Sequence, residues 1–323
     1  MPSLTEWKVP AGVQPRPEDF KFDLDRALDA VVGLHCIIPE DAFTAETLGT
    51  ERAGNGVLID EGLILTIGYL ITEAETIWVH LGDGAVVPGT VLGVDQESGL
   101  GLVQVLGDID IIPLKLGTSS AAKPGDQVVV GGAGGRTRSV SGKIAAVQEF
   151  AGYWEYFIDD ALFTHPAHPN WGGAALIDGK GELIGIGSLQ IEREHGGQSE
   201  HLNMVVPIDL LKPVLDDLRK FGRVNRPARP WLGLYAAEVE DKVVVVGIAK
   251  RGPAARAELK TGDVILAVDG EEVRDSAEFY QALWSLGAAG VDVPLTLYRG
   301  GDTFDVELVS TDRARMLKAP RLH

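Results

Sequence analysis

A loop rich in chemically useful side chains lies just past the middle of the chain, at residues 165–176. His165 and His168 stand three positions apart there, and pairs of imidazoles are common ligands of transition metals. No cysteine or carboxylate stands close by in the loop to complete such a set of ligands. The sequence therefore predicts no metal and no cofactor, and a barrel that binds a metal through surface histidines is kept as an alternative.

Trp171 is the residue of this loop that decides its chemistry. It lies between Asn170 and the pair Gly172 and Gly173, and its indole has no hydroxyl that a base could deprotonate. The loop resembles the nucleophile loop of HtrA-type serine proteases, which have the trypsin fold, with Trp171 at the position of the family's serine. The resemblance implies a chain without its nucleophile. We expect the indole to pack into or over the former substrate cleft, because a large exposed aromatic leaves apolar surface in water.

The other members of the family's catalytic triad are replaced as well. In the stretch 63–71, Tyr69 stands at the position of the histidine, and in 95–103 Gly99 stands at that of the aspartate. A triad needs a nucleophile, a base that takes its proton and a carboxylate that orients the base. Pro169 stands where the family has an oxyanion-loop glycine, and proline has no backbone N–H to donate. The resemblance therefore implies that no catalytic residue remains.

A hydrolase with a rearranged, non-standard active site is the alternative interpretation of the same residues. Ser139, Ser141 and Ser188 lie on segments that resemble the protease, and His165 and His168 are close in sequence to the former nucleophile position. No histidine stands at the base position beside these serines. We therefore predict that the chain is not an enzyme.

The resemblance extends over residues 25–222 and implies a mainly β fold, a double β-barrel like that of trypsin. Short apolar runs separated by glycine, proline or acidic turns are typical of antiparallel barrels and agree with this fold. The first helical spacing of apolar residues runs from 208 to 221, and Gly222 is its expected end. Five further segments carry the resemblance in family order: 54–60, 128–131, 139–147, 182–188 and 203–208.

The segment 231–312 resembles a PDZ domain of the HtrA kind, an α+β fold, and residues 252–270 are its most specific motif. PDZ domains bind a peptide as an added strand and hold its terminal carboxylate in a nest of backbone N–H groups. The helix 277–286 would form one wall of the groove, with Ser276 as its expected N-cap. The resemblance assigns peptide binding to Trp231, Leu232, Gly233, Leu234 and Leu283.

The sequence divides into five parts. An N-terminal extension (1–24) precedes the barrel body (25–222), and a linker (223–230) leads to the PDZ domain (231–312) and a C-terminal tail (313–323). The linker contains three arginines and two prolines, a composition typical of an extended, semi-rigid connection.

Composition limits the classes of partner and the location. The 323 residues carry a formal net charge of −18, which opposes binding to nucleic acid and to anionic membrane surfaces. No apolar run reaches the length of a membrane span. The N-terminus has neither the basic start nor the apolar core of a secretory signal, so we expect a cytoplasmic protein. The single cysteine, Cys36, excludes an internal disulfide and lies in an apolar run typical of a buried strand.

Together these observations predict a pseudoprotease that binds proteins or peptides as an adaptor, scaffold or regulatory subunit. The family resemblance implies a homo- or hetero-oligomer, because family barrels trimerise, and an active protease relative is one expected partner. The aromatic residues near the N-terminus that are candidates for such contacts are Trp7, Phe20 and Phe22.

Overall fold

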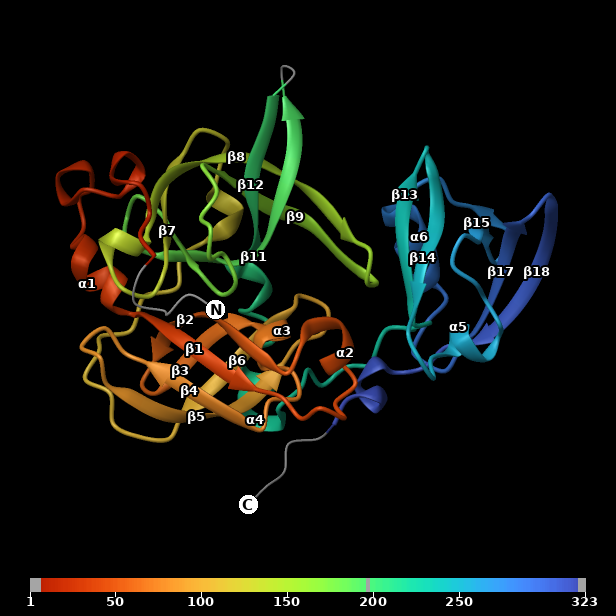
Figure 1. The fold of residues 1–323 in the computed structure, drawn as a ribbon, viewed down its shortest axis with the longest axis horizontal. Coiled ribbons are helices and arrows are strands. Elements are labelled where there is room, and N and C mark those ends of the chain that lie inside the picture. The colour runs from red at the N-terminus through yellow and green to blue at the C-terminus, as the bar shows by residue number, and fades with distance from the viewer. Residues whose placement is uncertain (1–6, 196–197, 319–323) are drawn as a thin grey trace. The chain divides into compact units, whose positions relative to one another are not determined.

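The computed structural model describes residues 7–195 and 198–318, and they form two compact units (Figure 1). The first six residues of the predicted extension and the last five of the predicted tail lie outside the described residues. The hairpin tip 149–159, which the sequence places in the barrel body, packs with the C-terminal unit. The first unit contains the chain up to Gln148 and Asp160–Val224, and the second contains Glu149–Asp159 and Asn225–Lys318.

The first barrel is closed by six antiparallel strands in the order β1-β2-β3-β6-β5-β4. Asp23 caps the helix that leads into it, because its carboxylate accepts a hydrogen bond from the backbone N–H of Arg26. The strands are β1 (Val31–Ile37), β2 (Glu51–Asp60), β3 (Leu63–Ile67), β4 (Thr76–His80), β5 (Val86–Val94) and β6 (Leu100–Val105). The helices are α1 (Leu24–Asp29), α2 (Ala45–Leu48) and α3 (Gly68–Ile71), preceded by the 3-10 turns η1 (Ala11–Val13) and η2 (Pro17–Asp19).

The second barrel repeats this plan with the strand order β10-β11-β12-β9-β8-β7. The double β-barrel predicted from the sequence is thereby confirmed. Its strands are β7 (Gln127–Gly131), β8 (Val140–Gly152), β9 (Tyr156–His165), β10 (Ala175–Ile177), β11 (Leu183–His195) and β12 (Gln198–Pro207). The 3-10 turn η3 (Ser119–Ala121) precedes these strands, η4 (Arg136–Arg138) joins β7 to β8, and η5 (Ile208–Leu210) follows β12.

Inward-facing side chains fill both barrels, as small barrels require. In the second barrel, Val128 and Val130 of β7 meet Leu176 of β10 inside one apolar cluster. In the first, Cys36 on β1 is buried, and burial raises the pKa of its thiol to about 12. The thiol is therefore a packing group, as its apolar sequence context predicted.

The helix predicted over 208–221 forms in two pieces. Residues 208–210 make the 3-10 turn η5, and α4 (Leu215–Phe221) follows after a run of turns. Pro213 explains the break, because proline lacks the N–H that an α-helix needs and disfavours helical geometry in the residue before it. The end at Gly222 is as predicted, since this residue takes the left-handed backbone of a helix C-cap with a φ of 69°.

The second unit contains a sheet in the order β13-β14-β15-β17-β18, with β16 paired to β15, so that β13 is an edge strand. This unit contains the predicted PDZ domain, the hairpin tip 149–159, residues 225–230 of the predicted linker and residues 313–318 of the predicted tail. Its strands are β13 (Leu234–Val239), β14 (Lys242–Ile248), β15 (Val264–Val268), β16 (Glu271–Glu272), β17 (Asp292–Arg299) and β18 (Asp302–Val309). Its helices are α5 (Pro253–Arg256) and α6 (Ser276–Ser285), with the 3-10 turn η6 (Arg313–Met316) near the end.

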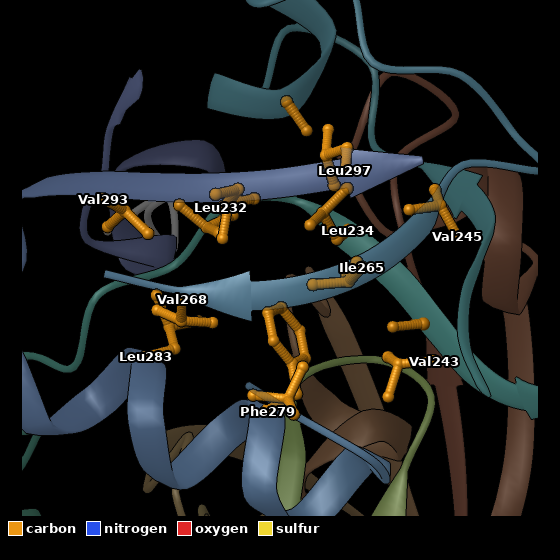
Figure 2. Close-up of a cluster of buried hydrophobic side chains, with 14 of the residues drawn as sticks. Leu232, Leu234, Val243, Val245, Ile265, Val268, Phe279, Leu283, Val293 and Leu297 are labelled. Atoms are coloured by element: carbon orange, nitrogen blue, oxygen red, sulfur yellow. The ribbon is translucent and has the colours of Figure 1, made fainter. Parts of the chain in front are cut away.

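Helix α6 packs its apolar face onto this sheet (Figure 2). Phe279 and Leu283 of α6 point toward Val268 and Ile265 of β15, and all four are buried. The N-cap of α6 is Asp275, whose carboxylate accepts the backbone N–H of Glu278 at 2.8 Å. The prediction of Ser276 as the cap is wrong by one residue, because the carboxylate just before it reaches the same orphan donors.

Candidate functional site

The structure brings together, between the barrels of the first unit, the three positions that the family resemblance assigns to a triad. Tyr69 lies on α3, directly after β3, and the backbone N–H of Gly68 donates to the carbonyl of Gly99 at 2.6 Å. A Cβ atom built on Gly172 would lie 2.7 Å from the phenol oxygen of Tyr69. Tyr69 therefore lies beside both Gly99 and the loop that carries Trp171.

The side chains at these positions bond to each other and to the backbone. The phenol of Tyr69 donates to the carbonyl of Ser188 at 2.9 Å. Burial raises the pKa of this phenol, while a hydrogen bond with the side chain of Trp171 acts in the opposite direction. The indole is half-buried. The site thus holds a neutral phenol and an indole, and neither group is a base or an activated nucleophile at neutral pH.

Gly99 has a structural role of its own. It takes a left-handed backbone with a φ of 74° in a tight turn, where its N–H donates to the carbonyl of Asp95 at 2.9 Å. The carboxylate of Asp95 accepts the backbone N–H groups of Glu97 and Ser98. A residue with a Cβ is disfavoured in this conformation, so the local backbone suits glycine.

His168 is a fully buried structural residue, and the prediction of surface histidines is wrong for it. Its side chain is buried, and both ring nitrogens have backbone partners there. Nε2 donates to the carbonyl of Arg138 at 2.7 Å, and Nδ1 accepts the N–H of Asn170 at 3.0 Å. Asn203 fixes its backbone by accepting the N–H of His168 at 2.6 Å. Burial lowers the pKa of the ring, so the imidazole is neutral with its proton on Nε2.

The alternative of a histidine metal site gains no support from this geometry. Both nitrogens of His168 are engaged, and exposed His165 lies with Nδ1 3.3 Å from a carboxylate oxygen of Glu200. Within residues 7–195 and 198–318, no group of three histidine, cysteine or acidic side chains is arranged to hold a metal ion. The side chain of His195 lies outside the described residues.

The loop that the family resemblance assigns to the oxyanion hole has few free backbone donors. Pro169 has no N–H, and the N–H of Asn170 is directed to His168. An oxyanion hole depends on backbone N–H groups aimed at one oxygen atom. The missing N–H of Pro169 was visible in the sequence, whereas the bond from Asn170 to His168 was not, because the partners of this histidine come from distant segments.

Asn55 of β2 holds this loop in place, and sequence reasoning treated it only as part of a strand. Its side-chain amide donates to the carbonyls of Asn170 at 2.9 Å and Gly172 at 3.1 Å, while its side-chain oxygen accepts the N–H of Ala133 at 2.9 Å. Buried polar side chains need such partners. The one sequence signal for this role is an asparagine within an otherwise apolar run of the strand.

We define the carboxylate nest of the PDZ domain as the backbone N–H groups of Leu232, Gly233 and Leu234. In the structure all three groups donate to one acceptor from the same chain. The carboxylate of Glu155 accepts all three, with the shortest distance, 2.7 Å, to Gly233. Trp231 does not join them, because its backbone pairs with Thr311 in both directions at 3.0 Å.

Leu283 lies at 0% exposure in the apolar core of the PDZ domain (Figure 2). Sequence reasoning missed Glu155, whose only signal is an acidic residue within the aromatic run 150–157.

Two family models match this chain. Residues 54–186 match the trypsin-like peptidase domain and residues 230–309 match the PDZ domain. The chain therefore has a trypsin-like peptidase domain followed by a PDZ domain, and the HtrA-type architecture that the sequence resemblance implied is confirmed.

Curated relatives and solved structures agree with this assignment. The chain is 33% identical over 277 residues to a probable periplasmic serine endoprotease, DegP-like, of Halomonas elongata, covering 80% of this chain and 56% of that protein. It is 29% identical over 246 residues to the serine endoprotease DegS of Haemophilus influenzae, covering 74% and 71% of the two chains. The chain thus spans just over half the length of the DegP-like relatives. The solved structure of the HtrA-type protease AlgW with a decapeptide shares its fold, with a TM-score of 0.54 and 23% identity over 92% of this chain and 98% of that one.

The predicted cytoplasmic location is wrong. The DegP-like relatives of this chain are named periplasmic, and the composition of the N-terminal residues misled the prediction. Among the helices that the structure describes, none has the length and apolar character needed to cross a bilayer.

Proposed function

We propose that this protein is a proteolytically inactive member of the HtrA/DegP type that works by binding other proteins. The observation that carries the proposal is Trp171, which stands at the centre of the nucleophile loop beside Tyr69 and the Gly99 turn. Relatives are named serine endoproteases, so the proposal is that this chain has lost their chemistry and kept their scaffold. An adaptor, a scaffold and a regulatory subunit are the roles that need binding without catalysis.

The loop geometry supports this proposal independently of the triad positions. Without a donor at Pro169, a tetrahedral intermediate would lose charge stabilisation that is worth about 3 kcal/mol. The neutral imidazole of His168 is also bonded on both sides, so it cannot replace the missing base without breaking a buried network. These contacts disfavour the alternative of a rearranged hydrolase.

Purified protein should not hydrolyse unfolded casein or ester substrates above the buffer blank, because no described side chain at the former site is an activated nucleophile. Turnover and labelling by a serine-directed phosphonate are the measurements, with an active serine endoprotease of the same type as positive control. Stoichiometric labelling together with turnover would reject the proposal and favour the rearranged hydrolase.

The PDZ domain is the proposed binding element. Its nest of three N–H groups suits a carboxylate, and β13 is an edge strand to which an extended chain can add. The relative AlgW has been solved with a decapeptide and with a tripeptide, and we extend peptide binding to this chain. The proposed ligand is the C-terminus of a protein chain.

Among C-terminal decapeptides that end in an apolar residue, some should bind the full-length chain with Kd on the order of micromolar or weaker, since a short strand loses much entropy on ordering. Amidation of the terminal carboxylate should weaken binding by at least about tenfold, because it removes the charged acceptor. Fluorescence anisotropy measures both. Equal binding of free and amidated peptides would contradict recognition through the nest.

We further propose that the protein works as part of a homo- or hetero-oligomer, with an active protease relative as one candidate partner. Of the three candidate aromatic contacts, Trp7 packs edge-on against His168 at 5.6 Å between ring centroids and therefore serves inside the chain. Phe20 and Phe22 lie against each other at 5.3 Å and are half-buried. They remain the aromatic candidates for a contact with another subunit.

A further inference from the structure

The hairpin tip 149–159 carries a carboxylate that imitates the end of a peptide chain. One oxygen of Glu155 accepts the N–H groups of Leu232, Gly233 and Leu234 at 3.2, 2.7 and 3.0 Å, and the other accepts Leu232 at 3.2 Å. Three backbone donors converging on one carboxylate are the arrangement by which a backbone nest captures a chain terminus. Here the carboxylate comes from a side chain of the same protein.

The backbone of the hairpin tip is bonded to both walls of the groove. On one wall, Ala236 of the edge strand β13 donates its N–H to the carbonyl of Tyr153 at 2.8 Å. On the other wall, the phenol of Tyr280 on α6 donates to the carbonyl of Gly152 at 2.8 Å and accepts the N–H of Glu155 at 3.2 Å. The tip therefore lies between β13 and α6, where an added peptide strand would lie.

Apolar contacts extend this attachment. Ala151 and Phe157 of the tip pack against the core of the PDZ domain, and Tyr153 meets Tyr235 of β13 edge-on at 6.1 Å between ring centroids. Within the tip, Trp154 stacks on Tyr156 at 5.3 Å. The tip thus packs on the PDZ domain through apolar and aromatic side chains as well as through backbone hydrogen bonds.

The burial of Glu155 shows that the nest binds its carboxylate specifically. The residue is 9% exposed, and a carboxylate taken out of water is strongly destabilised unless it is hydrogen-bonded or paired. Burial raises its pKa to about 7, while the three nest bonds and the charge of Arg313 act in the opposite direction. Tyr280 of the PDZ domain and Arg313, which directly follows the domain in the second unit, are the titratable or charged groups that interact with it. Glu155 lies in the turn between β8 and β9 and takes a left-handed backbone with a φ of 59°.

We propose that the hairpin tip is an internal ligand of the PDZ domain, and that a peptide C-terminus binds the nest only by displacing Glu155. The inference rests on the proposed peptide binding, and it adds the state of the groove before a partner arrives. A partner must supply a terminal carboxylate that takes over the three N–H bonds. It must also supply an apolar or aromatic end that replaces the side-chain contacts of the tip. Chains that lack either feature leave the groove closed.

The cost of displacement should appear directly in the affinity. The apparent Kd of a ligand rises in inverse proportion to the fraction of protein whose site is open. A carboxylate tethered in the same chain acts at an effective concentration of about millimolar or more, so the closed form should dominate. Removing the carboxylate should raise affinity without changing any residue of the PDZ domain.

The test compares full-length wild type, Glu155→Ala and Glu155→Gln. The probe is a fluorescein-labelled decapeptide ending in Gly-Tyr-Trp with a free carboxylate, which copies the tip residues before Glu155. We expect Glu155→Ala to bind it at least about tenfold tighter than wild type, with Glu155→Gln between them because its amide is a weaker, neutral acceptor. Glu149→Ala is the matched control, since it removes an exposed glutamate from the same tip, and it should bind as wild type does. Equal affinity in wild type and Glu155→Ala would overturn the inference.

A second measurement without peptide separates this inference from the proposed function. Amide hydrogen exchange of Gly233, Leu234 and Ala236 should be faster in Glu155→Ala than in wild type, while exchange in the central strand β15 stays unchanged. Unchanged exchange at the nest would overturn the inference. Faster exchange with no peptide bound by any variant would reject the proposed peptide binding. It would still support the binding of Glu155 to the nest.

Discussion

Restoring the three triad side chains together, in the variant Tyr69→His, Gly99→Asp and Trp171→Ser, should leave the protein essentially without protease activity. We expect its kcat/KM on a peptide substrate to stay at least about a thousandfold below that of an active relative. The reason is the backbone of the loop, which these substitutions do not change. Pro169 still lacks its N–H, and the N–H of Asn170 still points to His168.

The Gly99→Asp change adds a second obstacle. Position 99 has a φ of 74°, and a side chain there costs about 1 kcal/mol or more of backbone strain. The carbonyl of Gly99 also accepts the N–H of Gly68 next to Tyr69. Strain at residue 99 is therefore transmitted to the residue that must act as the base.

Adding Pro169→Gly to the triple variant should raise activity by about tenfold or more, because one backbone donor returns to the oxyanion position. Turnover and phosphonate labelling of the triple and quadruple variants measure this gain, and Trp171→Ser alone is the inactive control. High activity of the triple variant without Pro169→Gly would show that the loop donors are not limiting.

The sequence predicted the parts of the fold that local patterns encode. The family resemblance implied the double barrel and the PDZ domain, and the short apolar runs with their glycine turns agreed with a barrel. The helix over 208–221 was predicted as one piece because apolar spacing alone ignored Pro213, whose missing N–H interrupts it. The proline that interrupts the helix is visible in the sequence, but the prediction followed the apolar spacing instead.

The site was harder to predict because its key contacts join distant residues. Tyr69, Gly99 and Trp171 were found through family motifs, each of which is local. The contacts of Glu155 with the nest span about 80 positions, from 77 to 79 residues, and those of His168 with Asn203 span 35. An acidic residue in a hairpin looks like an ordinary solvated side chain until the fold supplies its partners.

Gly173→Ala should be the most destabilising small substitution in the loop 165–176. A Cβ atom at this position would lie 1.8 Å from the backbone oxygen of Asn55 and 2.6 Å from the hydroxyl of Thr66. The oxygen of Asn55 cannot retreat easily, because it accepts that same hydroxyl at 2.6 Å. The φ of Gly173 is 75°, so alanine would also be strained. We expect the free energy of unfolding of the barrel unit to fall by about 3 kcal/mol or more.

Urea denaturation followed by tryptophan fluorescence measures this loss, with Gly179→Ala as the matched control. A Cβ on Gly179 meets nothing within 4 Å, so that variant should stay within about 0.5 kcal/mol of wild type. The contact tested also holds the loop that presents Trp171, since Asn55 bonds to the carbonyls of Asn170 and Gly172. A loss below about 1 kcal/mol in Gly173→Ala would mean that the loop yields readily. The loop would then not hold the N–H of Asn170 firmly on His168, because a loop that moves to admit a methyl group can also rearrange this bond.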